Sequence, residues 1–209
     1  MKLYSSVGPN PRLVRMFLIE KRIEVERIHY DIIAGTNRSE EFAAVNVLQT
    51  LPVLELDDGI RLTESLPICE YLEEVQPDPN LIGRTPVERA EVRKWLRWFD
   101  QDVVVPMTTG FRGGAGRPMF APRMSVASPE AAAELTALAN EKFAWLDGQL
   151  GGRDHLALGR FTLADLLVFC FIRFGFTVGW KLPEGTANLA RLVEQTSQRP
   201  SAAVWKDSE

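Results

Sequence analysis

The sequence predicts an α/β domain at the N-terminus followed by an all-helical domain. Two observations support this fold class. Over residues 1–75, short apolar strand patterns alternate with helical ones, whereas only helical periodicity recurs after residue 86. Between these regions the chain is rich in proline, from Gln76 to Pro86. We therefore expect domains at residues 1–76 and 86–209, joined by a linker at 77–85.

The composition excludes several functional classes. The chain has 209 residues, 45% of them hydrophobic, and a net charge of −4 with acidic and basic residues interspersed. Such a surface offers no attraction for nucleic acid or for an anionic membrane, so neither is an expected partner. No signal peptide or membrane-spanning apolar run is apparent, and we expect a cytoplasmic protein.

Cysteine and histidine give no sign of a disulfide framework or a metal site. Cys69 and Cys170 lie within apolar helical patterns, where a thiol behaves as a small buried hydrophobe. His29 and His155 lack the spacing of metal ligands. We expect two free thiols and no metal.

The first domain opens with a predicted strand, helix and strand. Residues 2–5 alternate like a strand, apolar residues then recur at helical spacing from Leu13 to Leu18, and residues 25–30 again read as a strand. A loop containing Gly35 and Asn37 follows, and residues 39–46 form a short helix.

The stretch from residue 46 to 74 predicts a hairpin and a further helix. Apolar runs at 53–56 and 60–62 flank Asp57-Asp58-Gly59, which is typical of a hairpin. Pro52 stands at the start of the first strand, where a cis peptide bond is one option. Thr63-Glu64-Ser65 opens the helix, with Pro67 in its first turn. The order β-α-β-α-β-β-α resembles a thioredoxin-like fold.

These elements predict a ligand site with three parts. The backbone N–H and C=O of Leu51 suit a peptide, the helix N-terminus at Ser65 suits a carboxylate, and Glu64 suits an ammonium group. A ligand with an amino-acid head and a peptide body would satisfy all three. The alternative is that Ser65 is only a helix cap and Pro52 only marks a strand edge.

The residues from 46 to 65 resemble the glutathione-binding half of the cytosolic glutathione S-transferases, whose pattern is close to N-P-x-G-x-V-P-V-L, a hairpin, then E-S. The resemblance covers essentially the whole chain. It implies that glutathione, as co-substrate, is bound by Gln49, Thr50, Leu51, Pro52, Glu64 and Ser65. It also implies a homodimer that detoxifies small hydrophobic electrophiles by thiolate addition or displacement, with thioether cleavage or peroxide reduction as variants.

The chain departs from the family at two places. Gln49-Thr50-Leu51 stands where members usually carry Gly, then Lys or Gln, then Val, and Arg38 is a candidate for the missing cation. Gly8 stands where other classes carry an activating Cys or Ser. Without a cysteine in residues 5–11, a thiol–disulfide oxidoreductase is disfavoured.

The turn at residues 8–11 looks most like the T/S-P-N-G turn of the bacterial nu class, where the Asn side chain lies near the thiol. This resemblance implies Asn10 as the activating residue and Ser6 as the second candidate, ahead of Ser5 and Tyr4. An alternative role for Asn10 is to cap the helix that begins there. Because of Gly8, we also consider a noncatalytic binding or regulatory protein of the same fold.

The second domain predicts three long helices. The first is amphipathic from Val87 to Val103 and should kink or end at Pro106. The second spans residues 129–150. The third spans 162–177 and is apolar nearly all round, with a capping box from Thr162 to Asp165 and a staple from Phe161. Its F-T-L-A-D-L start resembles the F-S-I-A-D cap of the transferase family.

Residues 106–129 form an unusually long connection between helices. It is either a lid over an apolar substrate or a mobile surface connector. The candidate electrophile-binding residues are Val7, Met107, Phe111 and Trp180.

Overall fold

A computed structural model describes residues 1–205. Its contacts divide the chain into two compact units, one of residues 1–82 with the segment from Thr196 onward, the other of residues 83–195. The domain limits expected from the sequence, 1–76 and 86–209, differ from this grouping mainly in where the C-terminal segment is placed. Each unit is described by itself.

The first unit is built on a four-stranded mixed sheet. Its strands are β1 (Lys2–Ser5), β2 (Glu26–His29), β3 (Val53–Glu55) and β4 (Arg61–Thr63), in the order β2-β1-β3-β4. β1 and β2 are parallel, and the other two pairs are antiparallel. This arrangement confirms the thioredoxin-like fold.

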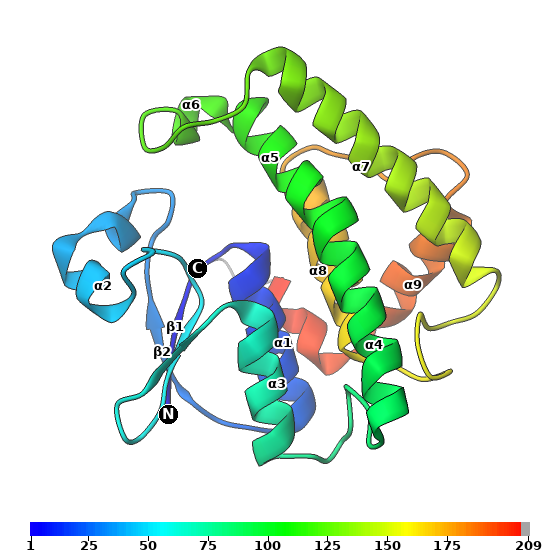
Figure 1. Ribbon diagram of the computed structural model, residues 1–209, viewed down its shortest axis with the longest axis horizontal. Helices are drawn as coiled ribbons and strands as arrows, with labels where there is room; N and C mark the ends of the chain where they lie inside the picture. The colour runs from blue at the N-terminus through cyan, green and yellow to red at the C-terminus, as the bar shows by residue number, and fades with distance from the viewer. Residues whose placement is uncertain (206–209) are drawn as a thin grey trace. The chain divides into compact units, whose positions relative to one another are not determined.

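Helices lie against both faces of this sheet. Figure 1 shows α2 (Glu40–Val45) on one side and α1 (Pro9–Lys21) with α3 (Ser65–Val75) on the other. A one-turn 3₁₀ helix, η1 (Thr36–Arg38), precedes α2. On the α2 side, Tyr4, Phe42 and Val53 form a buried apolar cluster. Because strand side chains alternate, Ser5 points to the opposite side from Tyr4.

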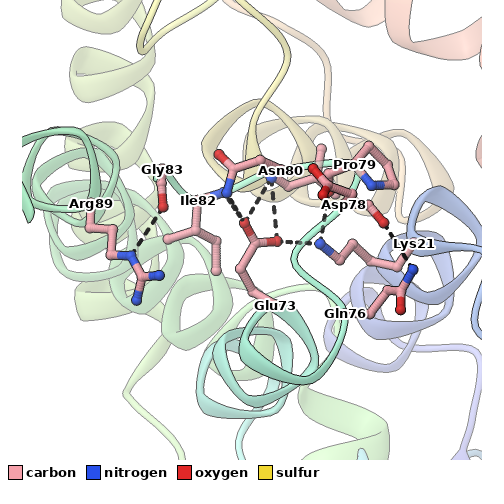
Figure 2. A network of polar contacts seen from close by, with 10 residues as sticks. Lys21, Glu73, Gln76, Asp78, Pro79, Asn80, Ile82, Gly83 and Arg89 are labelled. Atoms are coloured by element: carbon pink, nitrogen blue, oxygen red, sulfur yellow. Dashed lines mark hydrogen bonds and ion pairs between the residues drawn. The ribbon is translucent and has the colours of Figure 1, made fainter. Parts of the chain in front are cut away.

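A buried ion pair holds the chain as it leaves α3 (Figure 2). Lys21 Nζ lies 2.6 Å from Glu73 Oε2, and the two side chains are 0% and 3% exposed. Glu73 Oε1 also accepts hydrogen bonds from the backbone N–H groups of Leu81 and Ile82, at 3.0 and 3.1 Å. Asn80 Nδ2 donates to the same oxygen at 2.6 Å. One carboxylate thus joins α1, α3 and the segment that follows.

The C-terminal 3₁₀ helix η3 (Pro200–Trp205) packs on α1. The residue before it, Arg199, donates two hydrogen bonds to the Glu20 carboxylate, at 2.8 and 2.7 Å. Ser201 Oγ donates to the same carboxylate at 2.6 Å. Glu20 therefore fastens the C-terminal segment to the first unit.

Replacing Glu20 with glutamine is expected to change how stability depends on pH. Burial alone raises the pKa of Glu20, but the hydrogen bonds from Arg199 and Ser201 outweigh it and lower that pKa below its usual value. The ionised carboxylate therefore stabilises the fold above its unfolded-state pKa of about 4.3, and this contribution is lost as the pH falls through the folded pKa. At neutral pH, Glu20→Gln should unfold at lower urea concentration than the wild type.

That deficit should shrink as the pH falls below about 4.3. Urea unfolding at a series of pH values measures the difference, with Glu24→Gln, an exposed position of the same unit, as the control. A constant difference between Glu20→Gln and wild type across this range would contradict the role given to Glu20.

The second unit begins with one long helix that has a π segment in its middle. α4 (Pro86–Phe99), η2 (Asp100–Val104) and α5 (Val105–Gly113) follow one another without a break (Figure 1). The sequence predicts that this helix kinks or ends at Pro106; it does not end there, and its regular geometry is interrupted just before the proline. Val105 N–H donates to Asp100 O, five residues back, so the turn just before Pro106 is wider than an α-turn. That turn admits a proline ring, which in a regular helix collides with the carbonyl four residues earlier.

Part of the long connection at 106–129 is helical. Residues 106–113 belong to α5, and a four-residue helix, α6 (Arg117–Phe120), follows. Arg117 Nη1 donates to Ala127 O at 2.8 Å, which ties α6 to the start of the next helix. That helix, α7 (Pro129–Leu150), is capped by Ser128, which accepts from Ala131 N–H. A lid function for this stretch stays a prediction.

The centre of the second unit is α8 (Leu163–Thr177), which is buried over most of its length. Its predicted capping box is present. The sequence interpretation did not find α9 (Ala187–Ser197) or η3. Asp147 of α7 accepts from Asn188 Nδ2 and Leu189 N–H, at 2.9 and 2.8 Å, and so binds the first turn of α9. A signal for α9 was available, because Leu189, Leu192 and Val193 are apolar residues at helical spacing.

Across the 205 residues described, no helix combines the length and the apolar character that crossing a bilayer requires.

Candidate functional site

The backbone of Leu51 lies two residues before the start of β3 and is unpaired within residues 1–205. The Leu51–Pro52 peptide bond is cis, the option noted from the sequence. Within residues 1–205, neither the N–H nor the C=O of Leu51 makes a hydrogen bond. The β3–β4 register pairs Val53 with Thr63, and continuing it by two residues places Leu51 opposite Ser65. An unpaired peptide group thus lies just beyond the paired end of β3, on the same side of the hairpin as the residues that lead into α3.

The loop before Pro52 is held by two asparagines. Asn46 Nδ2 donates to Thr50 O at 2.9 Å and to Thr50 Oγ1 at 3.1 Å. Asn37 Nδ2 donates to Gln49 O at 2.7 Å, and Gln49 adopts a φ of +53°. Neither asparagine was among the predicted site residues. Both are polar residues buried to at least nine-tenths, and sequence alone does not reveal that burial.

Gln49, Thr50 and Arg38, which the sequence suggests as ligands for the glycyl carboxylate, differ in how available their side chains are. The Gln49 side chain donates through Nε2 to Ser39 O at 3.2 Å, so one of its polar atoms is already engaged in the fold. Thr50 and Arg38 are exposed. The side chains of Arg38, at the end of η1, and Thr50 are therefore accessible to a ligand.

The start of α3 presents backbone donors that have no hydrogen-bond partner within residues 1–205. Its first intrahelical bond runs from Ile68 N–H to Glu64 O, so the N–H groups of Ser65 and Leu66 precede it. Pro67 has no N–H. Glu64 is exposed and adopts a φ of +68°, a conformation that is strained for a residue other than glycine. The two free N–H groups and the positive end of the helix dipole favour an anion here.

Asn10 lies beside this helix start. Ser65 Oγ donates to Asn10 Oδ1 at 2.9 Å, which joins two predicted site residues that are 55 positions apart. Asn10 is the second residue of α1, and the N-cap is Gly8. The alternative role of Asn10 as the helix cap is therefore wrong.

The other candidates for thiol activation, Ser5, Ser6 and Tyr4, differ in whether their hydroxyl groups have hydrogen-bond partners. Ser5 and Ser6 are 3% and 0% exposed, and within residues 1–205 the hydroxyl of neither has a hydrogen-bond partner. Tyr4 donates its hydroxyl to Glu55 Oε2 at 3.1 Å. Burial, together with this carboxylate, raises the pKa of Tyr4. Tyr4 thus lies on the sheet face covered by α2. Its hydroxyl hydrogen is already donated to Glu55.

Three of the predicted electrophile-binding residues gather near the C-terminal end of α8. A Cβ on Gly175 would lie 2.4 Å from Trp180 Cε3 and 2.8 Å from Met107 Cε, so both side chains pack directly over this glycine. The Phe111 ring lies 5.3 Å from that of Phe174, measured between centroids. Met107 is buried, whereas Phe111 and Trp180 are half-buried. The fourth candidate, Val7, is half-buried in the first unit.

Trp180 is fixed by contacts with α7. Its indole Nε1 donates to Asn140 Oδ1 at 2.7 Å, and its ring lies 4.8 Å from that of Phe143. The orientation of this half-buried ring therefore depends on a specific hydrogen bond.

Among residues 1–205, no group of three or more His, Cys, Asp or Glu side chains is placed to hold a metal ion. Cys69 and Cys170 are both buried and form no disulfide.

Comparison with known proteins places these features in context. Residues 7–75 match the family described as the glutathione S-transferase N-terminal domain, and residues 109–200 match the corresponding C-terminal domain. The chain is 31% identical over 198 residues to human glutathione S-transferase theta-2B, covering 91% of this chain and 78% of that protein. It is also 31% identical over 177 residues to elongation factor 1-gamma of Schizosaccharomyces pombe, covering 84% of this chain but 41% of that protein.

Among solved structures, a sphingomonad glutathione S-transferase complexed with glutathione superposes with a TM-score of 0.82 at 25% identity. The superposition covers 99% of this chain and 98% of that one.

Proposed function

The chain belongs to the glutathione S-transferase family, and from that premise we propose that it is an active glutathione transferase. It binds glutathione, stabilises its thiolate, and adds it to a small hydrophobic electrophile or displaces a leaving group from one. Thioether cleavage and peroxide reduction are variants of the same chemistry. We further propose that it acts as a cytoplasmic homodimer.

The observation that carries this proposal is the peptide group of Leu51, which has no hydrogen bond within residues 1–205, next to the cis bond to Pro52. Glutathione combines a peptide body with an amino-acid head, so its cysteinyl peptide group would pair with Leu51 as an added strand. The γ-glutamyl carboxylate would accept from the N–H groups of Ser65 and Leu66, and the ammonium group would lie by Glu64. Gln49 and Thr50 would hold the glycyl carboxylate.

The chemical step requires the sulfur as a thiolate. A free thiol has a pKa of about 8.5, and lowering it by two units requires about 2.7 kcal/mol of preferential stabilisation of the anion. We propose that Asn10 donates to the sulfur and that Ser6, whose hydroxyl has no partner within residues 1–205, is the second donor. The thiolate then forms a carbon–sulfur bond. In displacement the leaving group departs with its electron pair, and in addition the substrate carbon takes a proton from solvent.

The electrophile would be bound through apolar contact. We propose Met107, Phe111 and Trp180 as contact residues. Met107 can adapt to varied shapes, and the aromatic rings offer flat apolar surfaces.

A second candidate function is that of a noncatalytic binding or regulatory protein. Gly8 stands where other classes carry the activating residue, and the similarity to elongation factor 1-gamma shows that this sequence pattern also occurs within a longer translation factor. Such a protein could retain the fold without turnover.

Calorimetric titration with glutathione, followed by assays against panels of electrophiles and peroxides, separates the two functions. The transferase proposal predicts that glutathione binds and that Asn10→Ala keeps most of this binding while losing turnover. If the wild type binds glutathione but no substrate in the panels reacts, the noncatalytic function is favoured.

A further inference from the structure

Arg173, near the C-terminal end of α8, is a half-buried cation without a counter-ion in the described structure. Within residues 1–205 its side chain makes no hydrogen bond, ion pair or ring contact. Its Nε atom is buried without an acceptor, whereas the two Nη atoms, which also lack acceptors, are not buried. The forked end of the guanidinium is therefore the part that a ligand can reach.

The fold supplies none of the partners that such a cation usually has. A charged group loses water on burial, and a partly buried arginine normally recovers this loss through a carboxylate or carbonyl acceptor. The other charged residue of α8, Asp165, lies about two turns earlier and accepts from Leu156 and Thr162. An arginine near a helix end can also donate to the last carbonyls, but Arg173 donates to none in residues 1–205.

Aromatic side chains flank Arg173 on the surface of α8. Phe174 follows it directly, and the Phe174 ring lies 5.3 Å from that of Phe111 between centroids. Phe176 is three residues further on, which places its Cβ about 5–6 Å from that of Arg173. The Phe176 ring stacks with the Trp180 ring at 6.3 Å and an interplanar angle of 22°. Arg173 thus lies between two aromatic pairs, and each pair includes a residue that we propose to contact the electrophile.

These rings are accessible as well as close to the cation. Phe176 is exposed, and Phe111, Phe174 and Trp180 are half-buried. Flat aromatic surfaces favour an aromatic ligand, and the two Nη atoms match the two oxygens of a carboxylate. A ligand that is aromatic over most of its surface and carries a carboxylate at one edge suits both features.

We propose that Arg173 is a specificity-determining residue that selects aromatic electrophiles bearing a carboxylate, to which its Nη atoms donate. This inference rests on the proposed function and names the class of electrophile. The carboxylate itself does not react. With an aryl chloride, the thiolate of glutathione forms the carbon–sulfur bond, the carbon–chlorine bond breaks, and chloride departs with its electron pair.

The test compares 4-chloro-3,5-dinitrobenzoate with 4-chloro-3,5-dinitrobenzamide, which has nearly the same shape but no charge. We would measure kcat/KM for each at saturating glutathione, relative to the uncatalysed reaction of the same compound. Calorimetry with the corresponding dinitrobenzoate and dinitrobenzamide, which lack the chloride, gives binding without turnover. The variants are Arg173→Met and Arg173→Lys. Arg97→Met, at an exposed position of α4 in the same unit, is the matched control.

The wild type should favour the carboxylate over the amide by about thirtyfold, the range expected for hydrogen bonds to a charged group. Arg173→Met should lose this preference and change the rate with the amide by less than about twofold. Arg173→Lys should keep part of the preference, since it keeps the charge but not the fork. Arg97→Met should match the wild type. Because Arg173 has no partner within residues 1–205, Arg173→Met should unfold at no lower urea concentration than the wild type.

The failures are distinguishable. If glutathione gives no binding heat with the wild type, the proposed function is overturned and this inference with it. If glutathione binds but the wild type treats carboxylate and amide alike, or reacts with neither, the inference alone is overturned. The same holds if Arg173→Met keeps the preference, or if it loses stability and reacts more slowly with both compounds to the same extent.

Discussion

Replacing Lys21 with methionine is expected to lower the free energy of unfolding by about 3–5 kcal/mol. Methionine keeps most of the volume but removes the ammonium that lies 2.6 Å from Glu73 Oε2. The remaining carboxylate is 3% exposed and would stay in place, because Leu81, Ile82 and Asn80 still donate to it. A buried charge without its counter-ion is one of the largest penalties a single substitution can impose.

The matched control is the Lys94–Glu91 pair, in which the side chains are 56% and 40% exposed at 2.7 Å. Lys94→Met should change stability by less than about 1 kcal/mol, since exposed ion pairs contribute little. Urea unfolding of both variants at neutral pH, followed by tryptophan fluorescence and circular dichroism, makes the comparison. Equal losses in the two variants would contradict the role assigned to the buried pair.

Replacing Asp165 with alanine is expected to destabilise the protein by about 3 kcal/mol, because several buried donors lose their acceptor at once. Asp165 is 0% exposed and accepts from Leu156 N–H at 2.9 Å, Thr162 N–H at 2.8 Å and Thr162 Oγ at 3.1 Å. Alanine cannot accept from any of them, and the site lies too deep for solvent to replace the carboxylate.

A second capping box in the same unit provides the control. Thr85 and Glu88 form the same motif at the start of α4, where Glu88 accepts from the Arg84 and Thr85 N–H groups in an exposed setting. Glu88→Ala should lose only about 1 kcal/mol, since water can bond the freed donors. Thermal unfolding of both variants measures the difference. A loss from Asp165→Ala no larger than that from Glu88→Ala would show that burial is not the source of the effect.

The elements predicted correctly from the sequence are those specified by local patterns. The hairpin follows from Asp57-Asp58-Gly59 between apolar runs, and Gly59 indeed has a φ of +86°. The capping box of α8 depends on residues three positions apart, Thr162 and Asp165. Such signals are readable because both partners lie within one turn of the chain.

Some features that escaped prediction depend on groups far apart in the sequence, whereas the π segment depends on packing. Lys21 and Glu73 are 52 positions apart, and nothing local marks either as buried. The π segment before Pro106 lets the helix continue its apolar face, although a proline is not compatible with a regular α-helix. The local sequence pattern identified Pro106 as a helix-breaking residue, but the helix continues past it into α5.

In the candidate site, too, some features have local sequence signals and others depend on residues far apart in the chain. Leu51, Pro52 and Ser65 were predicted as site residues because a strand start and a helix start have local signatures. The hydrogen bond between Ser65 and Asn10 joins two helix starts that only the fold brings together. Asn37 and Asn46 were missed because an asparagine in a loop carries no sign of the backbone group it will hold.

The most direct test of the central claim is the thiolate absorbance of glutathione bound to the wild-type protein, followed against pH. The account predicts a thiol pKa one to two units below the free value of about 8.5, which places a substantial fraction of the bound ligand as thiolate at neutral pH. Bound glutathione with an unchanged thiol pKa would contradict the account and favour a protein that holds glutathione without activating it.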